Sequence, residues 1–151
     1  MNEIIKFLKK RRSVTAKKML PGKVKDNDLR DILECALRVP DHGALSPWKI
    51  VVIQNAMRKT IGEKILLPEF KKYNDNFDEE KLLFEKNRFL RADKIIAVIY
   101  SPVESLKIPD WEMMLSTGAV CQNITIAAQS LNYAVQWVCL LYTSPSPRDI
   151  S

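Results

Sequence analysis

The sequence is poor in glycine and histidine, with four glycines and one histidine among 151 residues. Phosphate loops of the G-x-G-x-x-G or Walker type are absent, because these motifs need several closely spaced glycines. A histidine-based metal site is excluded as well, since His42 has no second imidazole to join it. Any nucleotide must therefore be bound by other means than these loops.

Cysteine is also scarce, and no C-x-x-C motif occurs. Cys35, Cys121 and Cys139 are odd in number, and each lies in an apolar neighbourhood, so we expect buried thiols. Reduced thiols are typical of the cytosol, and we expect a cytoplasmic protein. A secretory leader is not predicted, because the apolar residues at the start precede the basic ones and form too short a run.

Acidic residues are nearly missing from the first 25 positions, which hold nine lysines and arginines but only Glu3 as an acid. Because the net charge of the whole chain is +6, the remainder is slightly acidic. Basic segments attract phosphate on nucleic acids, lipids or cofactors, so a nucleic-acid-binding module is one interpretation. Phe7 is the only aromatic residue in this segment and no nucleic-acid-binding signature is present, so we favour a cofactor.

Charge is absent altogether from Met113 to Pro147. A membrane span is disfavoured because Gln122, Asn123 and Gln129 are costly in lipid. We expect a helix buried in a core or at a subunit interface, whose small residues would allow another helix to approach closely. A non-catalytic protein that docks a partner through this helix is a second alternative.

The length suits one domain, and the pattern of apolar residues predicts alternating helices and strands. Helices are expected from residue 3 to about 12, from Asp26 or Asp28 to about 38, over 56–66, within 70–87 after a loop, and from Pro109 onward. Strands are expected over 48–53 and 95–100, both buried, and over 133–138. The domain would span residues 1–138, because the Ser/Pro-rich segment 139–151 cannot continue a sheet.

Three motifs carry a resemblance to a known family. They are Arg-Arg-Ser at 11–13, R-V-P-D-H-G-A-L-S-P-W at 38–48, and Trp-Glu at 111–112 opening the long uncharged helix. Together they resemble the flavin-dependent nitroreductase family, in particular its short single-domain members, over about residues 3–138. The resemblance implies an α+β fold with a central, mainly antiparallel sheet flanked by helices, and a long buried helix at a dimer interface.

The resemblance also implies an activity. FMN would lie at the interface of a homodimer, held by residues of both chains, and would be reduced by NADH or NADPH. The electrons would pass to nitroaromatics, quinones or similar small acceptors, with no nucleic-acid or membrane partner. No catalytic side chain is assigned, because the flavin itself carries out the redox chemistry.

Site residues follow from the same resemblance. Arg11, Arg12 and Ser13 would hold the phosphate and ribityl end of FMN, while Arg38 and His42 would contact the flavin and Trp137 would approach it. The nicotinamide cofactor would lie near a stretch made of Ala127, Ala128, Gln129, Ser130, Leu131 and Asn132. Ser46 stands where many relatives carry glutamine, and its shorter side chain reaches less far.

Physical chemistry supports part of this assignment. Guanidinium groups pair with phosphate in a forked geometry that lysine lacks. Two such bonds contribute about 3–6 kcal/mol, which corresponds to affinity near millimolar, so the flavin ring must also be buried. Taken singly, each residue has a plainer interpretation: a solvated face for Arg11 and Arg12, a surface turn for His42, a helix end for Arg38, and a core for Trp48 and Trp137.

The end of the chain departs from the family pattern. Relatives continue well beyond the tryptophan of the third strand, whereas Trp137 is followed here by VCLLYTSPSPRDIS. We therefore expect an incomplete FMN domain followed by a disordered or non-native tail, and a sheet edge left without its neighbour. On this expectation the chain binds FMN weakly or not at all.

Overall fold

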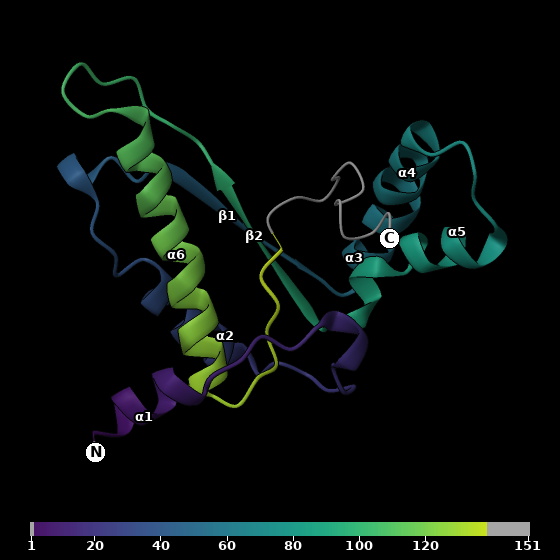
Figure 1. Ribbon diagram of the computed structural model, residues 1–151, viewed down its shortest axis with the longest axis horizontal. Helices are drawn as coiled ribbons and strands as arrows, with labels where there is room; N and C mark the ends of the chain where they lie inside the picture. Colours follow the sequence, from purple (N-terminus) through teal and green to yellow (C-terminus); the bar gives the residue numbers. More distant parts are fainter. Residues whose placement is uncertain (1, 139–151) are drawn as a thin grey trace.

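The computed structural model describes residues 2–138 and has an α+β fold (Figure 1). Two strands, β1 and β2, run between a group of helices formed by α1, α2 and α6 and a second group formed by α3, α4 and α5. The helices are α1 (Glu3–Lys10), α2 (Asp26–Ala36), α3 (Ala56–Ile61), α4 (Leu67–Tyr73), α5 (Glu79–Lys86) and α6 (Asp110–Ser130). The strands are β1 (Trp48–Gln54) and β2 (Lys94–Tyr100), and the short helical turns are η1 (Ala16–Lys18), η2 (His42–Ala44), η3 (Gly62–Leu66) and η4 (Arg88–Arg91).

The two strands pair antiparallel, with Trp48 opposite Tyr100 and Gln54 opposite Lys94. Side chains alternate between the faces of a strand, so Trp48, Ile50, Ile96 and Val98 share one face. That face packs against the helices α2 and α6. The other face is covered only near Ile53, and Val51 and Ile99 on it remain largely exposed.

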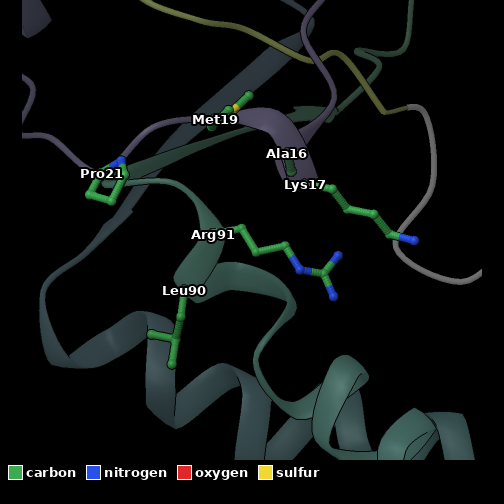
Figure 2. Close-up of a pocket in the computed structure, with 6 residues that line it drawn as sticks. All are labelled: Ala16, Lys17, Met19, Pro21, Leu90 and Arg91. Atoms are coloured by element: carbon green, nitrogen blue, oxygen red, sulfur yellow. The ribbon is translucent and has the colours of Figure 1, made fainter.

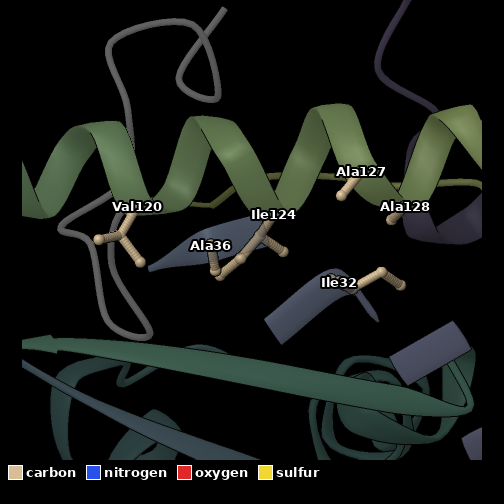
Figure 3. Close-up of a cluster of buried hydrophobic side chains, with 6 residues drawn as sticks. All are labelled: Ile32, Ala36, Val120, Ile124, Ala127 and Ala128. Carbon is tan, nitrogen blue, oxygen red and sulfur yellow. The ribbon is translucent and has the colours of Figure 1, made fainter. Parts of the chain in front are cut away.

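The main core lies between α2, α6 and the sheet (Figure 3). Apolar residues of α2 recur at the spacing of an amphipathic helix, and this places Ile32 and Ala36 on the side that faces α6. The α6 residues Val120, Ile124, Ala127 and Ala128 complete this cluster. Its small alanines let the two helices approach closely, as the sequence suggested.

A smaller cluster of Ile53, Leu66 and Phe89 joins the far end of the sheet to the second group of helices. Here α3 continues through η3, which is a single π-helical turn, into α4. Gly62 allows this turn to pass close to the end of α5, because a Cβ at this position would lie 2.0 Å from the Lys86 carbonyl oxygen.

Several predicted elements are confirmed within one or two residues, notably α1, α2, β1, β2 and α6. The helix expected over 56–66 is longer and reaches Tyr73, while the later helix is shorter and begins at Glu79. The prediction that both strands are buried is wrong, because the face against α2 and α6 is only partly buried and Ile53 is the single buried residue of the two strands. Of the two predicted starts of α2, Asp26 is the first helical residue and Lys25 holds the N-cap position, while Asp28 accepts a hydrogen bond from the Tyr133 hydroxyl at 2.6 Å.

The third strand predicted over 133–138 does not form. Among residues 2–138, its backbone bonds to other elements are two: Tyr133 N–H donates to Ala128 at the end of α6 at 3.0 Å, and Val135 accepts from Val14 N–H at 2.9 Å. An apolar, extended sequence becomes a strand only beside a continuous ladder of donors and acceptors, and the first residues of the chain supply a single bond.

The cysteine prediction is wrong in part, since Cys35 is exposed and Cys121 is half-buried. Cys35 lies in the last turn of α2, beside the buried Ala36 but outside the core cluster. Cys139 and the tail 139–151 lie outside the described residues. Among residues 2–138, no helix has the length and apolar character needed to cross a membrane.

Candidate functional site

The Arg-Arg-Ser segment leaves α1 and is fixed against the C-terminal end of α6. Gln129, in the last turn of α6, donates to the Arg12 carbonyl oxygen at 2.6 Å and accepts from the Arg11 guanidinium at 3.4 Å. Farther on, Gln136 accepts from the Ala16 N–H at 2.6 Å. The Arg12 guanidinium donates to the carbonyl oxygens of Arg11 at 2.9 Å and Lys9 at 3.5 Å, and residues 2–138 leave its other donors and most of those of Arg11 without a partner.

A hollow of about 540 Å³ lies beside this segment. Its lining includes four basic side chains and one acid: Lys6, Lys10, Arg11, Arg12 and Glu3. Glu3 lies 3.7 Å from Lys6, whereas neither arginine forms an ion pair with any residue between 2 and 138. The hollow therefore carries positive charge that a bound anion would compensate.

Polar side chains of α6 and its end complete the hollow. Gln129 and Asn132 line it together with Tyr133. Asn132 adopts a left-handed conformation, with φ of 65°, which ends α6 and turns the chain back across the hollow. This set of guanidinium, ammonium and amide donors fits the phosphate and hydroxyl groups of a nucleotide such as FMN.

His42 belongs to a second region, at the N-terminal end of α6. Its Nδ1 lies 2.7 Å from a carboxylate oxygen of Glu112, in the first turn of α6. The His42 side chain is 66% exposed, so one edge of the imidazole is held and the other faces outward. This geometry presents a fixed imidazole to any ligand that covers the loop.

The loop after His42 has an unusual backbone. Gly43, Ala44 and Ser46 have φ of 74°, 53° and 48°. Asp41 stabilises this shape by accepting from Ser46 N–H at 2.7 Å. Left-handed conformations at non-glycine residues are costly and occur preferentially where a loop binds a ligand.

Arg38 lies just beyond α2, with its side chain exposed. Asn123 of α6 donates to the carbonyl oxygens of both Cys35 and Arg38 at 3.0 Å. These bonds satisfy acceptors that the end of α2 leaves open. The backbone of Arg38 is thereby fixed against α6 at Asn123, and its guanidinium forms no ion pair with residues 2–138.

Within one chain, the hollow beside Arg12 and the loop that carries His42 lie far apart. Glu112 and Gln129 lie seventeen positions apart on a continuous helix, which corresponds to about 26 Å along its axis. Figure 1 shows α1 at the C-terminal end of α6, away from the loop that precedes β1. Arg12 and His42 can therefore meet at one ligand only if they come from different chains.

Two tyrosines fix the elements that carry these regions. The Tyr133 hydroxyl donates to Asp28, and this bond raises the pKa of Tyr133 above its usual value. Desolvation, together with a hydrogen bond to the Asp110 carboxylate at 2.6 Å, raises the pKa of Tyr100 to about 12. The neutral Tyr133 hydroxyl thus joins the segment after α6 to α2, and the neutral Tyr100 hydroxyl joins β2 to the start of α6.

The remaining predicted positions differ in their surroundings. Ala127 and Ala128 are buried against α2, and the Ser130 hydroxyl donates to the Ala127 carbonyl oxygen at 2.7 Å. Leu131 is 37% exposed, and Trp137 is 46% exposed instead of belonging to the core. Within 127–132, only Gln129 and Asn132 line the hollow.

Sequence reasoning missed the contacts made by Glu112, Asn123 and Gln129. Each joins positions at least 70 residues apart in the chain, so no local pattern reveals the pairing. A weak signal did exist, because polar residues inside an otherwise uncharged helix need partners when they are covered.

Comparison with known proteins adds to this geometry. The model described as "Nitroreductase family" matches residues 8–144. A Haemophilus influenzae protein described as "Putative NAD(P)H nitroreductase" is 33% identical over 113 residues, which cover 73% of this chain and 59% of that protein.

Solved structures agree on the fold. The nitroreductase-like family protein from Bacillus cereus matches with a TM-score of 0.64 and 24% identity, covering 87% of this chain and 66% of the other. An FMN-dependent nitroreductase from Clostridium difficile matches with a TM-score of 0.61 and 26% identity, covering 86% of this chain and 57% of the other. The chain thus spans roughly three fifths of the length of its relatives.

Proposed function

The chain belongs to the nitroreductase family, and from that membership we propose that it is an FMN-binding oxidoreductase domain. It would take hydride from NADH or NADPH and pass electrons to small acceptors such as nitroaromatics or quinones. The names of its relatives support this proposal, since one is called an NAD(P)H nitroreductase and another an FMN-dependent nitroreductase.

The observation that carries the proposal is the basic hollow beside Arg11 and Arg12. Two guanidinium groups without carboxylate partners among residues 2–138, next to amide groups of Gln129 and Asn132, match a phosphate with a polar chain attached. Ser13, the third predicted contact, is exposed next to Arg12 in the chain but does not line the hollow. We assign the phosphate and ribityl end of FMN to these residues.

The protein's part in the reaction is to bind and orient. Arg11 and Arg12 hold the phosphate, and Gln129 keeps their segment in place. His42, oriented by Glu112, would contact the ring from a second chain, together with Arg38. Trp137 offers an exposed apolar surface a few residues after Tyr133, which lines the hollow. Bound flavin supplies the hydride chemistry.

A homodimer follows from the separation of the two regions. If two chains pack their α6 helices antiparallel about a twofold axis, Arg12 of one chain approaches His42 of the other, and two equivalent sites result. The outward side of α6 suits such packing, because Trp111, Met114 and Leu115 are all more than half exposed. Apolar residues gathered on one side of a helix favour association.

FMN binding tests the assignment directly. Because weak binding is expected, FMN fluorescence should fall only at high protein concentration. The Arg12→Met variant should bind roughly 10–100-fold more weakly still, because a charge-assisted hydrogen bond contributes about 1.5–3 kcal/mol. Arg30→Met on α2 is the matched control, since Arg30 is exposed and lies outside the hollow. Equal affinity in both variants would contradict the assignment.

Mixing two defective chains tests whether the site is shared. Arg12→Met and His42→Ala should each bind poorly alone, whereas a refolded mixture should regain about one site in four, because each mixed dimer contains one intact pair. A site confined to one chain would give no recovery. An unmixed His42→Ala protein that binds FMN normally would remove His42 from the site.

A further inference from the structure

A second hollow, of about 440 Å³, shares no residue with the one beside Arg12. It lies between η1 and η4, as Figure 2 shows. Lys17 and Arg91 extend along it in the same direction, and its apolar lining comes from Ala16, Met19, Pro21 and Leu90. This volume falls within the range of small-molecule sites.

Both cations are held against one aromatic ring. The Lys17 Nζ lies 4.7 Å from the centroid of Phe84, and the Arg91 guanidinium carbon lies 3.5 Å from it. Arg91 also donates to the Phe84 carbonyl oxygen at 2.9 Å. The same ring thus lies beside two positive charges, and residues 2–138 take up few of their donors.

No carboxylate between residues 2 and 138 forms an ion pair with Lys17 or Arg91. The nearby Glu85 is 2.5 Å from Arg88 and largely buried. Desolvation lowers the pKa of Arg91, while the charge of Glu85 raises it and that of Arg88 lowers it to a smaller extent. Lys17 and Arg91 both line the hollow, so an anion bound there would compensate their charge.

We propose that Lys17 and Arg91 form a second anion site, which takes the phosphate of a phosphomonoester. A phosphate carries close to two negative charges at neutral pH, and this matches two cations better than a carboxylate does. The apolar surface of Met19, Pro21 and Leu90 would accept the body of the ligand, such as a nucleoside. This site goes beyond FMN binding and does not depend on it.

Two sources could supply such a phosphate: the 2′-phosphate of a dinucleotide such as NADPH, or the 5′-phosphate of a mononucleotide. Calorimetric titrations with 2′-AMP and 5′-AMP distinguish the two sources by which nucleotide binds more tightly. Tighter binding of either nucleotide than of adenosine supports the site. Adenosine, which lacks phosphate, should bind at least about tenfold more weakly than the better of the two.

Variants identify the residues. Lys17→Met should weaken the better nucleotide by about tenfold, whereas Lys18→Met, an exposed neighbour outside the hollow, should leave it unchanged. Arg91→Lys keeps the charge but loses the forked donors, so it should also bind more weakly, with an unchanged circular dichroism spectrum. Arg12→Met should leave AMP binding intact, which separates this site from the FMN site.

Three results would overturn the proposal. Equal affinity for adenosine and both nucleotides would show that phosphate is not recognised. Equal weakening by Lys17→Met and Lys18→Met would indicate attraction by net charge alone. Loss of AMP binding in Arg12→Met, with Lys17→Met unaffected, would place the phosphate in the first hollow.

Discussion

At the scale of single residues, the contact between His42 and Glu112 fixes an imidazole that would otherwise turn freely. Carboxylates accept hydrogen bonds, so the proton of a neutral His42 should reside on Nδ1. We predict that nitrogen-15 NMR of the only histidine will show a protonated Nδ1. Glu112→Ala should shift the ring toward the tautomer mixture of a free imidazole.

Glu104→Ala is the matched control, because Glu104 is exposed and makes no hydrogen bond or ion pair with the described residues. Stability should change by less than about 1 kcal/mol in Glu112→Ala, since the pair is partly solvated. A proton on Nε2 in the unmodified protein would contradict the orientation.

Tyr100 makes stability depend on alkaline pH. Its pKa is about 12 in the folded protein, against 10.0 for an unperturbed tyrosine. Above pH 10 the unfolded chain loses this proton while the folded chain keeps it, so the free energy of unfolding should fall as pH rises toward 12. Denaturant unfolding across this range should show a shallower fall for Tyr100→Phe, whereas Tyr73→Phe, on an exposed side chain, should follow the unmodified protein.

At the residue scale, the sequence shows where positive charge lies but not which groups will meet it, and the cofactor contacts of Arg11 and Arg12 remain predictions. Arg11 and Arg12 were expected to offer positive charge, and the structure leaves their guanidinium groups without carboxylate partners among residues 2–138. The partners of Gln129 were beyond reach, because they lie 117 and 118 positions away in sequence. Such pairs are set by how helices pack, which a single sequence does not specify.

At the scale of elements, the π-helical turn η3 depends on the absence of a side chain at Gly62. A Cβ there would meet the backbone at Lys86, which cannot move without shifting α5. We predict that Gly62→Ala lowers the free energy of unfolding by about 3 kcal/mol, a large effect for one methyl group. Thermal unfolding of Gly22→Ala, where a Cβ meets nothing within 4 Å, provides the control and should show little change.

Helix periodicity located α2 and α6 well, because an apolar stripe that recurs every three or four residues matches the turn of an α-helix and not the alternation of a strand. Extended segments were harder to place. IIAVIY and YAVQWV look alike in sequence, yet only the first has a neighbour with a continuous ladder, in β1. Because a strand forms only when two segments pair, the apolar pattern of one segment is insufficient to predict a strand.

At the scale of the whole molecule, the candidate site is divided between the two ends of α6. The resemblance predicted a site shared by two chains, and this remains a prediction. The structure gives it a geometric reason, since about 26 Å of helix separates the partners of Arg12 and His42. The uncharged stretch of sequence signalled a covered helix, but one chain covers only one side of it.

The exposed side of α6 provides the last prediction. Leu115 is 66% exposed in one chain, so Leu115→Arg should leave folding stability within about 0.5 kcal/mol. In an antiparallel pair of α6 helices the same arginine would be buried without a partner, and sedimentation should show loss of the dimer together with loss of FMN binding. Leu106→Arg, in an exposed loop, is the matched control and should assemble normally. A Leu115→Arg protein that still sediments as the unmodified one would move the interface away from this helix, and the shared site with it.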